Sequence, residues 1–126
     1  MAFEIINPEA FGARPSGWNH GMLAEKGGRI LFVAGQIVPV GDFVAQWDGA
    51  LGRVMEVVRA AGGTPENVGR MVVYITDRPA YLASRTPLGE VHRKHMGRHY
   101  CAMALVEVKS LIDSKALVEI EAVAVL

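Results

Sequence analysis

The chain has 126 residues, a length typical of one domain, and 51% of them are hydrophobic against 21% charged. This balance excludes an intrinsically disordered chain, which combines low hydrophobicity with high net charge. Because 13 basic side chains balance 13 acidic ones, we expect neither a nucleic-acid groove nor an anionic membrane surface.

Short strands are predicted near the N-terminus. An apolar, β-prone run covers Phe3–Ile6, and residues 11–19 carry enough glycine, proline and asparagine to form a loop. Strands over 21–25 and 29–34 are expected to pair as a hairpin, because the Lys-Gly-Gly sequence at 26–28 supplies a permissive turn.

One long amphipathic helix is predicted over 43–61, because its apolar residues recur at intervals of three and four. Asp42 is placed to cap the N-terminus of this helix, and Gly62 with Gly63 is expected to end it. After a turn, a buried strand is predicted over 70–76 from its run of β-prone residues.

A second helix is predicted between Pro79 and Met96. Pro87 must either open this helix or kink it, since proline lacks the N–H that an interior position donates. Strands over 102–108 and 117–125, separated by a polar turn, complete the chain. This order of elements predicts an α+β sandwich with two helices on one face of a mixed sheet.

The last predicted strand is apolar on both of its faces. Two helices can cover only one face of the sheet. The uncovered face would form an exposed apolar patch larger than monomers usually carry. We therefore expect this face to be buried against other copies of the chain.

The sequence contains no GxGxxG or P-loop motif, no GxSxG and no HExxH. His92 and His95 have helical spacing and His99 follows them, which raises a metal site as one possibility. No nearby cysteine or carboxylate completes such a site, and neighbouring cations such as Arg93 would repel a metal ion. A solvated basic helix end without metal is the favoured interpretation.

Cys101 is the only cysteine, which excludes an intrachain disulfide and a multi-thiolate zinc site. It lies two residues beyond His99, so on a strand both side chains would project to one face, as a thiolate–imidazole pair requires. A buried structural thiol is the favoured interpretation.

No targeting or membrane segment is evident in the sequence. The N-terminus lacks the basic and apolar regions of a secretory signal, and no apolar run reaches the ~18 residues that span a bilayer. We expect a cytoplasmic protein without a membrane partner.

Glu119 and Glu121 share one face of an otherwise apolar strand. Two carboxylates on a buried face repel each other and resist desolvation, so each needs a partner or a water-filled cleft. Such a pair can tune one carboxylate for proton transfer, whereas others serve in salt bridges or interfaces. For Glu119 both interpretations stay open, and for Glu121 a structural pairing is favoured.

Five segments follow one another along the chain: 31–37 (LFVAGQI), 59–62 (RAAG), 74–77 (YITD), 104–108 (ALVEV) and 118–124 (VEIEAVA). In this combination the chain resembles the RidA/YjgF family of reactive intermediate deaminases over nearly its whole length. The resemblance implies a chorismate-mutase-like fold and a homotrimer with clefts between subunits. It also implies hydrolysis of enamines or imines to a ketoacid and ammonia, without a cofactor.

The resemblance assigns roles to individual positions. Glu119 matches a glutamate that positions water or moves a proton, and Trp18 takes the place of an aromatic residue in the loop that closes the cleft. Gly35 matches a glycine whose backbone lines the pocket, and the N–H of Leu105 matches a group that helps to hold the substrate carboxylate. Met103 stands where active members carry an arginine that grips this carboxylate, and a thioether offers neither charge nor donors.

Two functions are compatible with this substitution. In the first, the protein is an enamine or imine hydrolase whose substrate is larger, less anionic, or held by Arg98 or His99. Without the buried guanidinium, binding of a small carboxylate substrate is weaker by ~2 to 5 kcal/mol. In the second, the trimer binds a small metabolite without catalysis, and Met103 and Trp18 form an apolar pocket. Nucleic-acid cleavage, as proposed for some relatives, ranks last because the composition offers no basic surface.

Overall fold

The computed structural model describes residues 3–126. At its centre is a four-stranded sheet with the strand order β3-β6-β4-β5. The strands are β3 (Ile30–Gln36), β6 (Val118–Val125), β4 (Val68–Ile75) and β5 (Ala102–Glu107). β4 and β5 are parallel, whereas β6 is antiparallel to both of its neighbours, so the sheet is mixed as predicted.

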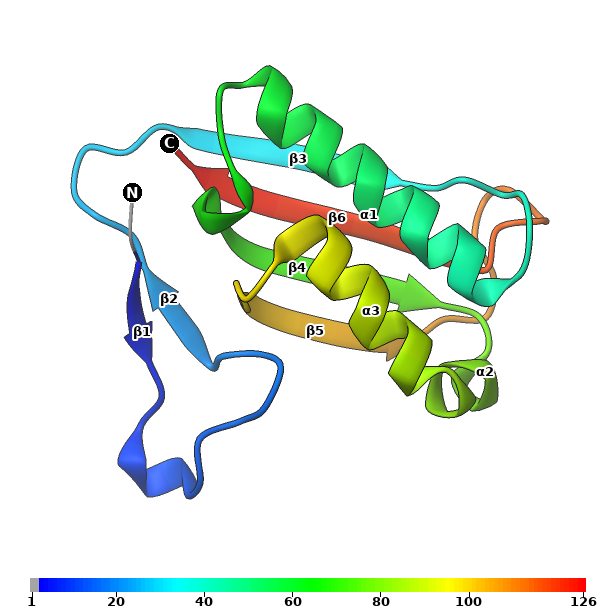
Figure 1. Cartoon of the computed structure of the whole chain (residues 1–126), viewed down its shortest axis with the longest axis horizontal. Helices are drawn as coiled ribbons and strands as arrows, with labels where there is room; N and C mark the ends of the chain where they lie inside the picture. Colours follow the sequence, from blue (N-terminus) through cyan, green and yellow to red (C-terminus); the bar gives the residue numbers. More distant parts are fainter. Residues whose placement is uncertain (1–2) are drawn as a thin grey trace.

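Helices cover one face of this sheet and give the predicted two-layer α+β fold (Figure 1). They are α1 (Phe43–Ala60), α2 (Arg78–Ala83) and α3 (Arg85–Met96). Two 3-10 turns, η1 (Glu9–Phe11) and η2 (Pro65–Asn67), precede β2 (Gly21–Leu23) and β4 in the chain. α1 begins where predicted, because Asp42 Oδ1 accepts a hydrogen bond of 2.9 Å from the Ala45 N–H. Just beyond its end, Gly62 has a φ of +89°, a conformation that glycine adopts readily. Within the described residues no helix is long and apolar enough to cross a membrane.

The helix predicted between Pro79 and Met96 is present as α3, but the predicted number of two helices is wrong, because the short helix α2 precedes α3 and the two meet at Ser84. The φ and ψ of Ser84 are −113° and 12°, outside helical geometry. Pro87 explains the break, since its ring would clash with the carbonyl of Ala83 four residues earlier if one helix continued through it. In the first turn of α3 its missing N–H costs no helical hydrogen bond, so Pro87 opens this helix.

The hairpin predicted from strands 21–25 and 29–34 is also wrong. β2 (Gly21–Leu23) pairs with β1 (Glu4–Ile6), and these two strands form a separate sheet, called here the N-terminal ribbon. The turn at 26–28 exists, but the strands on its two sides diverge (Figure 1). β3 pairs instead with β6, which offers a longer apolar partner that is buried beneath α1.

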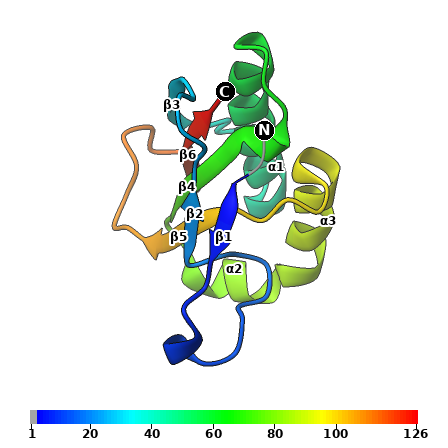
Figure 2. The same ribbon diagram turned by 90° about the vertical axis from the view of Figure 1, so that its left-hand side faces the viewer.

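The core lies between the sheet and the helices, and it contains Val118, Ile120, Ala122 and Ala124 of β6. The intervening residues of β6 face the other side of the sheet, called here the open face. Figure 2 shows the sheet from its edge, with the helices on one side of it. The open face carries Phe32 and Ile30, whose exposed fractions are 76% and 62%. The predicted second apolar face is therefore confirmed.

Candidate functional site

Glu119 lies on the open face beside the backbone of Gly35. β3 continues through Gly35, beyond the end of the strand predicted over 29–34, and its register on β6 shifts between Val33 and Gln36. A Cβ at Gly35 would lie 2.8 Å from Cδ of Glu119, so only glycine leaves room for the carboxyl group in this position. The strand irregularity and the glycine together bring these two predicted site residues into contact.

Glu121 has a partner on the neighbouring strand. The hydroxyl of Tyr74 in β4 donates a short hydrogen bond to Glu121 Oε1. This hydrogen bond, with burial and the nearby charge of Glu119, raises the pKa of Tyr74 above its usual value of 10.0. The structural pairing favoured for Glu121 is therefore present.

Glu119 is opposite Tyr74 in the strand register. Among residues 3–126 no side chain or backbone group forms a hydrogen bond with the Glu119 carboxylate. The two carboxylates thus differ in their surroundings, since one is bonded to a phenol and the other is unpaired. Sequence reasoning missed Tyr74, whose signal was its alternation with the buried Val73 and Ile75.

Met103 and Leu105 lie on the opposite side of the sheet from Glu119. Met103 is in register with Met71, which is buried in the core, and both β5 side chains pack against that core. Glu119 is instead in register with Tyr74, three residues along β4 from Met71. Because side chains alternate between the faces of a sheet, Glu119 and Met103 do not meet within one chain.

Trp18, Arg98 and His99 come together at a third place. They line a pocket of about 190 Å³ between the loop before β2 and the segment that enters β5. The Trp18 ring is 38% exposed and makes an edge contact with His20, with 4.6 Å between ring centroids. Neither Glu119 nor Gly35 lines this pocket.

Asn19 holds the loop of Trp18 in place, and sequence reasoning missed it. Its side chain donates a hydrogen bond of 2.6 Å to the carbonyl of Tyr100. Its backbone N–H donates to the carbonyl of Cys101 at 3.1 Å. An asparagine in a polar loop has no local pattern that predicts such distant partners, so only a weak signal was available.

The three histidines considered as metal ligands have separate partners. His92 Nε2 donates to the carbonyl of His99 at 2.9 Å, and burial lowers the pKa of His92. His95 Nε2 bonds to Asp48 Oδ1 at 2.5 Å. His99 Nε2 donates to the carbonyl of Val68 at 2.6 Å. In the described part of the chain no three His, Cys, Asp or Glu side chains are placed to hold a metal ion.

Cys101 is buried, and its surroundings disfavour a thiolate. Its exposed fraction is 2%, and burial raises the pKa of Cys101 to about 12. A nucleophilic cysteine requires a lowered pKa, and the nearby His99 ring is bonded to Val68 instead. These observations agree with the favoured interpretation of a structural thiol.

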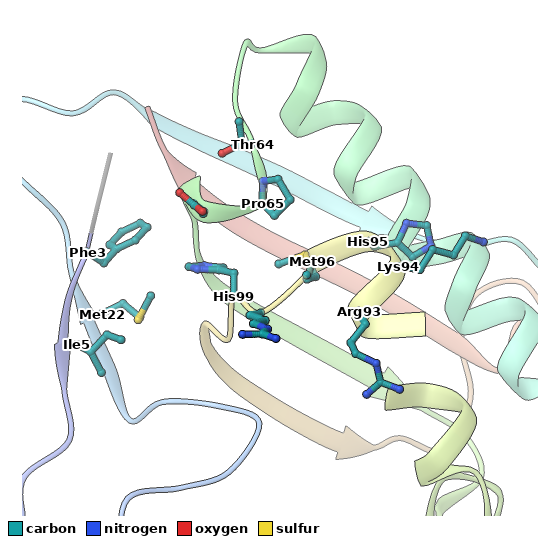
Figure 3. A pocket seen from close by; sticks show the side chains of 13 residues that line it. Phe3, Ile5, Met22, Thr64, Pro65, Arg93, Lys94, His95, Met96 and His99 are labelled. Carbon is teal, nitrogen blue, oxygen red and sulfur yellow. The ribbon is translucent and has the colours of Figure 1, made fainter. Parts of the chain in front are cut away.

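A larger cleft of about 720 Å³ opens between the N-terminal ribbon and the C-terminal end of α3 (Figure 3). Arg98 and His99 line this cleft as well as the smaller pocket beside Trp18. The predicted site residues therefore fall into three groups. Glu119 and Gly35 lie on the open face, Met103 and Leu105 against the core, and Trp18, Arg98 and His99 at these two cavities.

Residues 13–126 match the model of a family described as endoribonuclease L-PSP. The Rid-family protein YyfB from Yersinia pestis is 32% identical, with all of both chains covered and a TM-score of 0.82. The YjgF gene product from Escherichia coli is 25% identical, with 94% of this chain and 91% of that chain covered and a TM-score of 0.69. TdcF from Escherichia coli, solved with bound serine, is 26% identical, with 98% of both chains covered and a TM-score of 0.65.

Proposed function

Because this chain belongs to the Rid/YjgF family, whose model is described as endoribonuclease L-PSP, we propose that it is a cofactor-independent enamine or imine hydrolase. The observation that carries the proposal is the unpaired carboxylate of Glu119, which lies against the β3 backbone at Gly35. A carboxylate that lies against the strand backbone without an internal partner is available to bind water or to transfer a proton.

The proposed reaction adds water across a C=N bond. Glu119 accepts a proton from the attacking water while the oxygen of this water bonds to the imine carbon. The nitrogen is protonated and leaves as ammonia, and a C=O bond remains. An enamine first takes a proton on carbon to become the imine. General acid–base assistance of this kind contributes about 10²- to 10⁴-fold to a rate.

The proposed site is completed by a second copy of the chain. Glu119 lies on the open face of the sheet, whereas Met103 and Leu105 lie on the helix side of the edge strand β5. A neighbouring chain that packs on the open face would bring its own β5 edge toward Glu119. The exposed Phe32 and Ile30 on that face support such packing. We therefore propose the homotrimer with clefts between subunits, located in the cytoplasm.

The substrate class follows from Met103. Its side chain packs against the apolar core, where a thioether cannot hold a carboxylate. The proposed substrate is therefore larger or less anionic than a small 2-iminoacid, or its charge is held by Arg98 or His99. Small 2-iminoacids are expected to be poor substrates.

The test follows consumption of enzymatically generated imines by trapping them with semicarbazide. Imines derived from alanine, leucine and phenylalanine are compared in the wild type and in Glu119→Gln. We expect the wild type to accelerate hydrolysis of the larger imines and Glu119→Gln to lose about 10²-fold or more of this rate. Glu56→Gln, which removes an exposed carboxylate of α1, is the matched control and should keep the wild-type rate.

Met103→Arg tests the specificity part of the proposal in the same assay. A restored guanidinium should raise the rate on the alanine-derived imine about 30-fold or more, the lower end of the binding energy of such a contact. A folded Met103→Arg protein without any gain would show that position 103 does not limit the substrate range. Wild-type activity that survives in Glu119→Gln would contradict the proposed chemistry.

A non-catalytic small-metabolite binder is the second candidate function. It is favoured by the apolar packing of Met103 and Leu105 where a polar grip is expected. TdcF was solved with serine bound. A small ligand on a related fold is compatible with a binding protein as well as with an enzyme. An absence of hydrolysis on every imine, together with ligand binding by the wild type, would favour this second function.

A further inference from the structure

The cleft between the N-terminal ribbon and α3 does not contain Glu119, the proposed catalytic carboxylate, although Arg98 and His99 line it. It is lined by residues of β1, β2, η2 and the end of α3, and by the segment that follows α3. Figure 3 shows the side chains of Phe3, Ile5 and Met22 on the ribbon side, with those of α3 across from them. Its volume of about 720 Å³ falls within the range of small-molecule sites, roughly 300 to 1,000 Å³.

The ribbon side of the cleft is anchored at two points. The Phe3 ring rests on Gly69 of β4, where an added Cβ would lie 3.0 Å from the ring. At the far end of the ribbon, the Asn7 side chain donates a hydrogen bond of 2.9 Å to Asn19 Oδ1, and Asn19 is bonded in turn to Tyr100. Because both ends are tied to the body of the protein, the cleft is formed before any ligand binds.

The opposite side of the cleft is basic. Arg93, Lys94 and His95 occupy the last turn of α3, where positive side chains interact favourably with the helix C-terminus. Lys94 and His95 are already committed to Asp48, at 3.1 Å and 2.5 Å. These two side chains are therefore unavailable as the main contacts of an anion.

Arg98 remains as the cation best placed to bind a ligand, because the Arg93 guanidinium lies back along α3, 3.6 Å from the position that a Cβ of Gly89 would take. Gly97, with a φ of +61°, reverses the chain after α3 and carries Arg98 to the cleft. Among residues 3–126 neither Arg98 nor Arg93 has a carboxylate within ion-pair distance. Glu66, the acidic residue in the lining, disfavours a doubly charged ligand such as a phosphate ester but tolerates a monoanion.

We propose that this cleft is a second ligand site that binds a monocarboxylate with an apolar tail. The guanidinium of Arg98 holds the carboxylate, since its paired donors match the two oxygens. The tail lies against Phe3, Ile5 and Met22, where it removes apolar surface from water. Glu119 is not among the lining residues, so binding here does not require the carboxylate that is proposed for imine hydrolysis.

Calorimetric titration of the full chain with octanoate tests this proposal. We expect the wild type to bind octanoate, and octan-1-ol to bind at least about tenfold more weakly because it lacks the charge. Arg98→Gln should weaken octanoate binding about tenfold or more. Ile5→Ser should weaken octanoate and octan-1-ol alike, because it shortens the apolar wall. Arg59→Gln, an exposed arginine of α1 outside the cleft, is the matched control and should bind as the wild type does.

Glu119→Gln separates this site from the proposed catalytic one. It should bind octanoate with wild-type affinity even though it has lost hydrolysis. Unchanged binding by a folded Arg98→Gln protein, equal affinity for octanoate and octan-1-ol, or no octanoate binding by the wild type would overturn the proposal. Loss of octanoate binding in Glu119→Gln would also overturn it, because the ligand would then occupy the catalytic cleft.

Discussion

The absence of a side chain at Gly35 decides where a carboxylate lies. In Gly35→Ala the new methyl group would overlap the Glu119 carboxyl group. The carboxyl group is the end of a flexible side chain, so we expect it to move while the strand stays in place. Stability should change by less than about 0.5 kcal/mol, whereas imine hydrolysis should fall about 10²-fold, the cost of a displacement near 1 Å.

Thermal unfolding and the trapped-imine assay measure the two effects in Gly35→Ala. Gly89→Ala is the matched control, because a Cβ there would meet only Arg93 Nη1, at an ordinary distance of 3.6 Å. Full activity in Gly35→Ala would show that the position of Glu119 does not matter for the reaction.

The hydrogen bond between Tyr74 and Glu121 predicts a dependence of stability on pH. The bond raises the pKa of Tyr74 above 10.0, so the folded chain holds this proton more tightly than the unfolded chain does. Its stabilisation is complete below pH 10 and is lost as pH rises through the raised pKa. The difference in unfolding free energy between the wild type and Tyr74→Phe should therefore be constant near neutral pH, and it should become smaller above pH 10.

Urea unfolding at each pH measures the difference made by Tyr74→Phe. Tyr81→Phe is the comparison, since the Tyr81 hydroxyl forms no hydrogen bond to the described residues, and it should show no such narrowing. A Tyr74→Phe difference that stays constant well above pH 10 would disprove the assignment.

Between the two long helices, α1 and α3, an acidic side chain of α1 bonds to two basic side chains of α3. Asp48 of α1 accepts hydrogen bonds from His95 at 2.5 Å and from Lys94 at 3.1 Å. The bond with His95, helped by Lys94 and opposed by burial, lowers the pKa of Asp48 below its usual 3.8. Asp48→Asn should reduce the unfolding free energy by about 1 kcal/mol at neutral pH, the upper value for a partly exposed pair.

The pH dependence of Asp48→Asn has the opposite sign to that of Tyr74→Phe. Because the folded pKa of Asp48 is lowered, its stabilisation is present above 3.8 and is lost as pH falls through the folded value. Denaturant unfolding at neutral and acid pH should show the effect of Asp48→Asn shrinking in acid. Glu56→Gln should have little effect at either pH, and an equal loss at both would rule out this ion pair as the cause.

Elements with local signals were predictable, and elements that depend on distant partners were not. The helix 43–61 was recognised from its spacing, its cap at Asp42 and its end at Gly62, all of which act within a few residues. Pro87 was recognised as a disruption, but the choice between opening and kinking a helix depends on the path of the preceding chain. The hairpin prediction failed because β3 pairs with β6 from the other end of the chain.

At the level of the assembly, the open face should bury itself against other copies of the chain. We expect light scattering to give the mass of about three chains for the wild type. Phe32→Lys, which puts a charge on the most exposed ring of this face, should yield a folded monomer. It should also lose imine hydrolysis, because the proposed site needs two chains.

Val57→Lys is the matched control for the assembly, since Val57 is exposed on α1, on the far side of the sheet. It should stay trimeric and active. A wild-type protein that is monomeric in solution would contradict both the trimer and the shared site.

That all 126 residues form one domain remains a prediction.

The α+β class, the strands of the sheet, the capped helix and the family could all be recognised in the amino-acid order, because periodicity and caps act over short distances. The contact of Gly35 with Glu119 and the bond of Tyr74 to Glu121 join residues far apart in the chain. The placement of Met103 and Glu119 on opposite faces depends on strand register, in which a shift of one residue reverses every side chain. Register is set by packing against α1 and by distant strand partners, so only the tertiary structure decides on which surface each site residue lies.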